Sequence, residues 1–318
     1  GSNTAESLAK RGDLEIYGTY YSSPPLENKD IKMIKTDLTD NNDVIRAVKG
    51  MDIIIQSAAA CSGAKEMKEK PYFHLVDNAA MNPFIFRAAH EHGVSHVIFP
   101  SCTTMYHSSD KLIKEEDVDL NKGVPENYFG CGWAKILIEK ACELFATRTP
   151  GSKTKYTVFR HSNVYGPYDK YDLERSHVFG ATMTKVMTAP EGGKIIVWGT
   201  GEEERDLLYV SDIVSFIEEA LDKQKSQFEL INVGYGSSVS VANLVKMIIE
   251  ASGKNLKIEY DATKPTIKTK VALDSTKAKK IFGWKPKISL KEGIKITMDW
   301  YKENILKNQK ETESIFAQ

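Results

Sequence analysis

The first residues that could do chemistry stand at the start of the chain, where Gly1 and Ser2 directly precede a helical pattern over residues 3–11. The free amides at a helix N-terminus attract anions, and in dinucleotide-binding units a glycine-rich turn at this place receives the pyrophosphate. Gly1 is therefore a candidate cofactor contact, unless Gly1 and Ser2 are a cloning remnant. Since no strand precedes them, we expect the usual first strand of a dinucleotide-binding sheet to be missing.

The ends of two expected strands indicate which nicotinamide cofactor the chain would take. The strand over residues 15–21 is followed by no carboxylate that could bind the 2′-hydroxyl of an NAD ribose, which slightly favours NADP. No arginine for a 2′-phosphate stands there either, so NADP or NAD remains open. After the next strand, Asp37 and Leu38 could contact the adenine, with the carboxylate accepting from its amino group. Asp37 could equally cap the helix that follows.

Composition and cysteine spacing exclude several classes of partner. The four cysteines (Cys61, Cys102, Cys131 and Cys142) show neither CxxC spacing nor a histidine at metal-ligand spacing, so we expect no metal and reduced thiols. The 43 basic residues balance 43 acidic ones, which favours neither nucleic acid nor an anionic membrane as partner. Apolar runs fall far short of the roughly 20 residues that span a bilayer, and no secretory leader is visible, so we expect a cytoplasmic protein.

The elements that must position these residues alternate between short β-rich runs and amphipathic stretches as far as about residue 165. Such alternation is typical of parallel strands joined by helical crossovers, and it predicts a Rossmann-like doubly wound α/β fold. With 318 residues and 41% hydrophobic composition, the chain can bury a large core. The expected strands cover residues 15–21, 32–34, 52–56, 96–100 and 156–160. The expected helices cover residues 3–11, 41–49, 78–92 and 133–148.

After Pro167 the pattern changes to long loops rich in glycine and acidic residues, which we interpret as a smaller α/β lobe that binds substrate. Short segments remain at residues 194–198, 228–233 and 239–252. The predicted division is an NAD(P)-binding Rossmann-like domain over 1–165 and a mainly substrate-binding lobe over 166–307, from which segments can return to the first domain. The polar residues 308–318 lack an apolar stripe and are expected to be a frayed tail.

Several motifs resemble consecutive landmarks of one enzyme family. RHSNVYGPYD at residues 160–169 is followed by SHV at 176–178, VWGTG at 197–201 and RDLLYVSD at 205–212. Further landmarks are SAAA at 57–60, Asn78, the stretch 97–106, Lys264, Pro265, residues 274–278, Gly283, Trp284, Pro286, Ser289, Leu290, Gly293 and Trp300. Together they resemble the extended short-chain dehydrogenases, the NAD-dependent epimerase/dehydratase family, and within it most closely the GDP-L-fucose synthases. The resemblance runs from Gly1 to about Tyr301.

This resemblance implies an NAD(P)-dependent epimerase/reductase that acts on a GDP-linked, or other NDP-linked, 4-keto sugar in polysaccharide biosynthesis. The alternatives are a catalytically impaired homologue that still binds nucleotide sugars, or an NDP-sugar 4-epimerase or dehydratase. The expected helices 78–92 and 133–148 resemble the pair through which family members dimerise, so a homodimer with a four-helix interface is expected. The implied cofactor contacts are Ala58, Ala59, Ala60, Lys135, His161, Asn163 and Val164.

The family's acid/base pair is altered in this chain. In such enzymes a tyrosine transfers a proton, and a lysine four residues later lowers the pKa of its phenol and binds the nicotinamide ribose. Lys135 suits the lysine's role, but Cys131 stands where the tyrosine would be. Either the acid/base is lost at this position, or Tyr128 reaches the site from the helix start, or Cys131 transfers the proton with a pKa lowered by the lysine.

The supporting groups are displaced as well. The family places a serine or threonine four residues before the position of Tyr106. Cys102 occupies that position in this chain, and we favour the hydroxyl of the neighbouring Thr103 as its substitute. Thr104 stands where the fucose synthases have the cysteine that epimerises the sugar. We therefore do not expect the family's epimerisation at carbons 3 and 5 to be retained complete in this chain. Reduction of a 4-keto group remains open. His177 corresponds to the general acid of the epimerisation step.

The resemblance also implies a set of substrate contacts. A residue at the carboxyl end of a strand lies where ligands bind in open α/β sheets, and this places Asn163 near sugar or diphosphate oxygens. Arg205 suits a diphosphate because its planar guanidinium binds two oxygens at once, although an ion pair with Glu203 or Glu204 is the alternative. Trp198 either lies beside the base or packs within the smaller lobe. The full set is Thr104, Asn163, His177, Val178, Trp198 and Arg205.

Overall fold

The computed structural model describes residues 1–60, 69–70, 72–173, 176–264 and 266–307. Its centre is a parallel sheet in the order β3-β4-β5-β9. The strands are β3 (Ile53–Ile55), β4 (His96–Ser101), β5 (Lys155–His161) and β9 (Phe228–Val233). β4 and β5 are buried along almost their whole length, as expected for parallel strands covered on both faces.

A second parallel sheet is formed by β1 (Ile16–Tyr20) and β2 (Ile31–Lys35). Within the described chain, no strand pairing joins this sheet to β3. The chain still alternates strands with helical crossovers, so the doubly wound Rossmann-like α/β class is confirmed.

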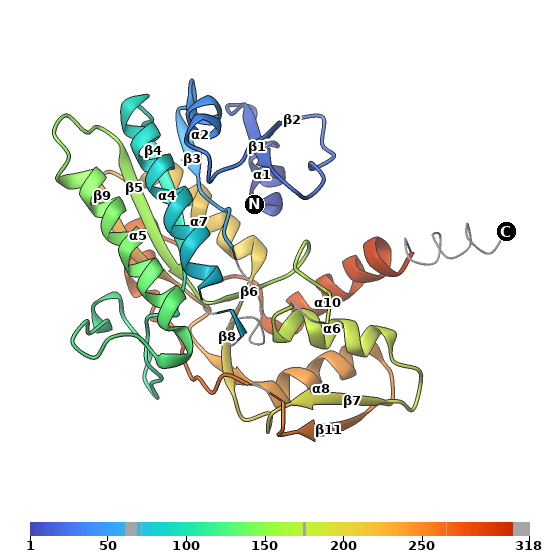
Figure 1. The fold of residues 1–318 in the computed structure, drawn as a ribbon. Coiled ribbons are helices and arrows are strands. Elements are labelled where there is room, and N and C mark those ends of the chain that lie inside the picture. Colours follow the sequence, from blue (N-terminus) through green and yellow to red (C-terminus); the bar gives the residue numbers. More distant parts are fainter. Residues whose placement is uncertain (61–68, 71, 174–175, 265, 308–318) are drawn as a thin grey trace.

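Helices cover both faces of the central sheet (Figure 1). On one face α2 (Asn41–Val48), α4 (Phe73–Glu91) and α5 (Phe129–Thr147) bury a core that includes Phe86, Phe99 and Tyr156. On the other face α7 (Val210–Lys223) and α9 (Thr276–Phe282) pack against the sheet through Phe216 and Phe282. α1 (Ser2–Leu8) packs against α7, and Ser7 donates a hydrogen bond to Glu218.

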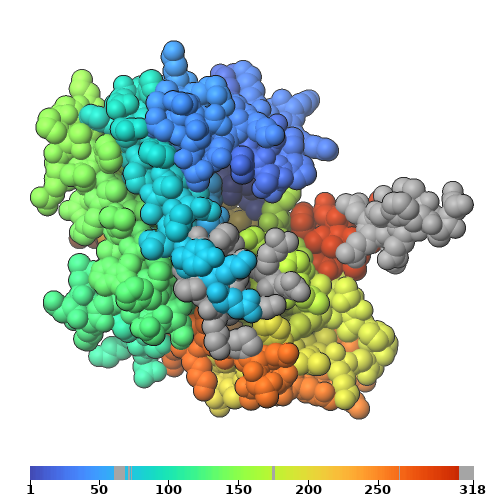
Figure 2. All heavy atoms as spheres, viewed as in Figure 1, coloured from blue at the N-terminus to red at the C-terminus, as the bar shows by residue number. Residues whose placement is uncertain are grey.

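The later residues form a second layer of helices and small sheets with its own apolar core. Its helices are α6 (Val178–Thr188), α8 (Val241–Ser252) and α10 (Leu290–Tyr301). Its sheets are β7 (Lys194–Trp198) with β11 (Lys257–Asp261), and β6 (Asn163–Tyr165), β8 (Glu204–Tyr209) and β10 (Ser238–Ser240) in the order β10-β8-β6. Short helical turns cover Glu115–Asp117, Glu126–Tyr128 and Lys302–Leu306. In Figure 2 the N-terminal residues (blue) and this layer (yellow and orange) lie at opposite ends of the molecule.

The expected strands agree with β1 to β5 to within two residues, but the expectation for the later chain is partly wrong. Helices α6, α7, α9 and α10 lie where long loops and short segments were expected. α4 and α5 also begin earlier than predicted, at Phe73 and Phe129. Leu75, Val76 and Phe129 in these first turns are exposed, so they do not extend the buried apolar stripe by which the sequence marks a helix. β9 pairs with β5, so a segment beyond residue 166 does return to the central sheet.

Three expectations lie outside the described residues: the frayed tail over 308–318, the thiol of Cys61 and the landmark Pro265. The division into domains at residue 165 stays a prediction. In the described part of the chain, no helix is both long enough and apolar enough to cross a membrane.

Candidate active site

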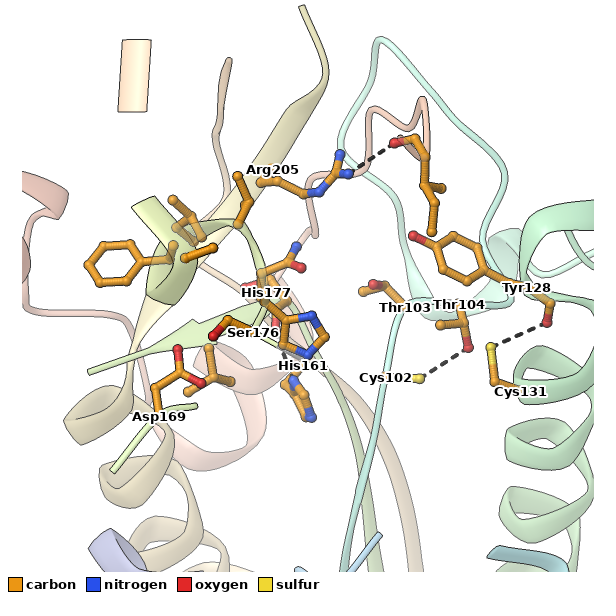
Figure 3. A pocket seen from close by; sticks show the side chains of 18 of the residues that line it. Cys102, Thr103, Thr104, Tyr128, Cys131, His161, Asp169, Ser176, His177 and Arg205 are labelled. Carbon is orange, nitrogen blue, oxygen red and sulfur yellow. Dashed lines mark hydrogen bonds between the residues drawn. The ribbon is translucent and has the colours of Figure 1, made fainter. Parts of the chain in front are cut away.

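A cavity of about 550 Å³ lies at the carboxyl ends of the central strands and is lined by residues from both halves of the chain (Figure 3). Ligands bind at this edge in open α/β sheets because the strand-to-helix loops diverge there. Of the predicted site residues, those that line it are Ala58, Ala59, Ala60, Cys102, Thr103, Thr104, Tyr128, Cys131, Lys135, His161, Asn163, Val164, His177, Val178, Trp198 and Arg205.

Three predicted cofactor contacts lie outside this lining. A Cβ on Gly1 would stand 3.7 Å from the Cβ of Ser57, so Gly1 borders the cavity at the end of β3. Asp37 accepts hydrogen bonds from the backbone and hydroxyl of Thr39, while Asp40 caps α2. The alternative in which Asp37 caps the helix is therefore wrong. Contact of Gly1, Asp37 and Leu38 with a cofactor stays a prediction.

The first turn of α5 packs closely against the loop after β4, and a glycine permits this approach. A Cβ on Gly132 would lie 3.0 Å from Val124 and 3.2 Å from the carbonyl oxygen of Thr104. Because Gly132 lacks this atom, Cys131 comes next to Thr104 and Cys102 (Figure 3). The Sγ of Cys102 lies 3.1 Å from Oγ1 of Thr104. Two thiols and a hydroxyl therefore occupy the region where the family resemblance places the acid/base and its supporting hydroxyl.

The environment of Cys131 opposes ionisation of its thiol. Burial, followed by the neighbouring Cys102, raises the pKa of Cys131 to about 12. The lowered pKa expected from a nearby lysine is therefore wrong. The reason lies in Lys135, whose ammonium donates to the carbonyl of Pro100 at 3.2 Å and stands over the ring of Phe99 instead. Cys131 itself donates to the carbonyl of Tyr128 at 3.4 Å.

Tyr128 points its hydroxyl toward the middle of the cavity, between Arg205 and Thr104 (Figure 3). It is the residue directly before α5, where the chain leaves a short helical turn. Burial raises the pKa of its phenol, and the positive charge of Arg205 opposes this rise. The structure thus brings a phenol into the cavity from the helix start, seven residues before Lys135.

Arg205 and Asn163 come from neighbouring strands, because β6 pairs with β8, and Asn163 lies opposite Leu207, two residues beyond Arg205. The guanidinium of Arg205 donates to the carbonyls of Glu204 and Ile267 at 2.8 and 2.9 Å, and to the hydroxyl of Thr269 at 2.9 Å. Within the described residues it forms no ion pair, so the predicted alternative with Glu203 or Glu204 is wrong. These bonds hold the guanidinium at the cavity wall and leave further N–H groups for a ligand.

Two histidines in the cavity are held in the neutral form. Burial lowers the pKa of His161 to about 4, and its Nδ1 lies 2.7 Å from the carbonyl oxygen of Ser162. Burial also lowers the pKa of His177, with a smaller contribution from the charges of Lys170 and Arg205. A neutral imidazole can donate one proton and accept another, which suits a role in proton transfer. Among the described residues, no group of three or more potential ligands forms a metal site.

Sequence reasoning missed three charged residues of the cavity, Lys185, Asp169 and Glu203. Lys185, on α6, lies in the lining and places its ammonium 5.6 Å from the ring centroid of Trp198. Asp169 closes the motif over residues 160–169, and burial raises its pKa to about 6. A Cβ on Gly180 would lie 2.3 Å from the carbonyl of Lys170, so this glycine lets the loop with Asp169 pack against α6. The apolar residues of α6 repeat at helical spacing, and this pattern was the signal in the sequence that could have placed Lys185 on a helix.

The chain is similar to several known enzymes. The chain is 29% identical to "GDP-L-fucose synthase 1" of Arabidopsis thaliana over 254 residues, which cover 79% of this chain and 77% of that protein. It is also 29% identical to "GDP-L-colitose synthase" of Yersinia pseudotuberculosis over 252 residues, covering 79% and 81% of the two chains. The crystal structure of the UDP-glucose 4-epimerase of Thermotoga maritima with UDP-glucose matches with a TM-score of 0.83 and 26% identity, covering 96% of each chain.

The family model of the NAD dependent epimerase/dehydratase family matches residues 1–234. That span contains the central sheet up to β9 and most of the cavity lining. The chain therefore belongs to the NAD dependent epimerase/dehydratase family.

Proposed function

We propose that this chain binds a nucleoside-diphosphate sugar, with a GDP-linked 4-keto sugar as the preferred substrate, and reduces it with NADPH or NADH. The observation that carries the proposal is the shared cavity of Lys135, Asn163 and Arg205. The similarity to GDP-L-fucose and GDP-L-colitose synthases supports the choice of sugar nucleotide. Bound nicotinamide would supply hydride, and Lys135, Ala58 and His161 are among the residues that would hold it.

Reduction fits the described side chains better than epimerisation. Thr104 takes the place where the resemblance puts an epimerising base, and an alcohol is a very weak base at neutral pH. Reduction of a 4-keto group instead needs one proton donated to the developing alkoxide. Tyr128 and Cys131 both line the cavity and carry a dissociable proton. A homologue that binds the sugar nucleotide but reacts slowly remains the second candidate, because the thiol of Cys131 replaces the family's phenol.

Binding of the diphosphate depends on Arg205 in this proposal. Arg205→Lys is expected to weaken the binding of GDP about 10-fold, because an ammonium cannot bind two phosphate oxygens in one plane. Isothermal titration calorimetry measures the affinity. Arg148→Lys, an exposed change directly after α5 and outside the cavity, serves as the control and should leave the affinity unchanged. Equal affinity of GDP for the wild type and Arg205→Lys would contradict the proposed diphosphate site.

We further propose that the chain forms a homodimer through α4 and α5. These helices pack side by side, and the outer face of α5 carries an apolar stripe of Phe129, Trp133, Leu137 and Leu144, which are 36–60% exposed. Exposed apolar patches of this kind mark protein interfaces. The resemblance of this helix pair to the family's dimer interface makes a second copy the expected partner.

Leu137→Glu is expected to shift the protein from dimer to monomer, because it places a charge in the middle of the apolar stripe, where Leu137 is 56% exposed. Size-exclusion chromatography with light scattering measures the mass. Ile296→Glu, at a 40% exposed position on α10, introduces the same charge far along the chain and should leave the mass unchanged. A wild-type protein that is already monomeric would contradict the proposed interface.

A further inference from the structure

Residues 266–273, which we call the strap, connect two sides of the cavity beyond β11. On one side the backbone N–H of Glu204, in β8, donates to the carbonyl of Thr269 at 3.1 Å. On the other side the backbone N–H of Ser109, in the loop after β4, donates to the carbonyl of Lys270 at 2.9 Å. The strap therefore ties the loop after β4 to the strand that forms the opposite wall of the cavity.

Thr269 holds the guanidinium of Arg205 from the strap. Its hydroxyl oxygen accepts a hydrogen bond from Nη1 of Arg205 at 2.9 Å, and its carbonyl oxygen lies 3.3 Å from the same nitrogen. Within the described chain, the other partners of this guanidinium are the backbone carbonyls of Glu204 and Ile267. A hydroxyl that accepts from an N–H group keeps its own proton for a second partner. The side chain of Thr269 can therefore serve two groups at once.

The second partner of this hydroxyl is the phenol of Tyr128, which points into the cavity toward Arg205 (Figure 3). Burial raises the pKa of Tyr128, and the thiols of Cys131 and Cys102 add to this rise. The charge of Arg205 and the hydrogen bond with Thr269 both oppose it. A hydrogen bond that lowers the pKa of a phenol is one donated to its oxygen. The three groups therefore form a chain from the guanidinium through the hydroxyl to the phenol.

We propose that Thr269 is a positioning residue that fixes Arg205 at the cavity wall and directs its own hydroxyl proton to the phenol oxygen of Tyr128. The inference rests on the proposed function, to which the diphosphate contact of Arg205 belongs. A proton that Tyr128 gives to a developing alkoxide leaves the electron pair on the phenol oxygen, and the hydroxyl of Thr269, polarised by Arg205, stabilises that phenolate. The family resemblance assigns this task to a lysine, but Lys135 donates to the carbonyl of Pro100 instead.

The test is Thr269→Val in the full chain, which removes the hydroxyl and keeps the branched shape of the side chain. Calorimetry should show GDP binding about 3- to 10-fold more weakly, because the guanidinium loses one of the hydrogen bonds that hold it. NMR of isotope-labelled tyrosine, with the Tyr128 signal assigned by its absence in Tyr128→Phe, should show this phenol titrating at higher pH, because its phenolate has lost a donor. The same signal should already move at neutral pH. Thr269→Ser keeps the hydroxyl and should restore both properties.

Thr263→Val is the matched control. Thr263 is exposed, lies outside the cavity lining and donates to Asp261, so its change should leave the GDP affinity and the Tyr128 signal as in the wild type. The inference is overturned if Thr269→Val keeps either wild-type property, because the hydroxyl must serve both groups. It is also overturned if Thr269→Ser behaves like Thr269→Val, which would assign the threonine to packing alone. A wild type that binds no GDP would instead refute the proposed function, and the Tyr128 signal would then decide the inference by itself.

Discussion

A Cys131→Tyr variant is expected to reduce a GDP-linked 4-keto sugar about 100- to 10,000-fold faster than the wild type, which is the usual contribution of a placed general acid. Residue 131 lies in the first turn of α5, one helical turn before Lys135, and faces the cavity. A phenol there would reach farther into the cavity than the short thiol, whose pKa of about 12 makes it a weak proton donor. The measurement is the rate of NADPH consumption at saturating substrate.

Tyr128→Phe distinguishes an acid/base supplied by Tyr128 from one that is lost at position 131. If Tyr128 already donates the proton, Tyr128→Phe in the wild-type background lowers the rate strongly and Cys131→Tyr adds little. If the acid/base is lost, Tyr128→Phe changes little and the gain from Cys131→Tyr survives in the double variant. Binding of GDP should be similar in all three variants, because none of them removes Arg205 or Asn163. A gain caused only by tighter nucleotide binding would contradict the assignment of position 131 to proton transfer.

Glu139→Ala and Arg160→Met are each expected to lower the free energy of unfolding by about 3–5 kcal/mol, because each leaves an uncompensated buried charge. Both residues are 4% exposed, and their carboxylate and guanidinium approach to 2.7 Å. Ser101 donates to the same carboxylate, and Arg160 also donates to the hydroxyl of Tyr106. The network ties α5 to β4 and β5, one helical turn beyond Lys135. Urea unfolding followed by circular dichroism measures the change.

A surface ion pair on the same helix provides the control. Glu143 pairs with Lys140 at 2.7 Å, with 66% of the lysine side chain exposed, so Glu143→Ala should cost less than about 1 kcal/mol. Replacing both buried partners by methionine should recover part of the loss, because an apolar pair leaves no unpaired charge. Equal effects at Glu139 and Glu143 would show that the buried network contributes no more than a surface pair.

The sequence by itself determined three strands of the central sheet, β3, β4 and β5, and several of the residues that gather at its carboxyl edge. Runs such as residues 96–100 and 156–160 are apolar and short, and a parallel strand buried on both faces needs that pattern. The polar residues that directly follow them lie at one edge because parallel strands all end on the same side. This is why Asn163 could be assigned to the site before any coordinates, whereas Cys102 was assigned from the family resemblance.

Tertiary structure alone decided how the side chains of that site are charged and held. Arg205 is fixed by carbonyls of Ile267 and Thr269, more than 60 residues away, and no local pattern predicts such partners. The pKa of Cys131 rises because folding buries its thiol, while packing turns Lys135 toward Pro100. Glu203 stands in a run of three glutamates that the sequence cannot tell apart, and only the fold buries that one and leaves its oxygens unpaired. Ionisation depends on desolvation and on neighbours brought together by folding, and spacing along the chain contains neither.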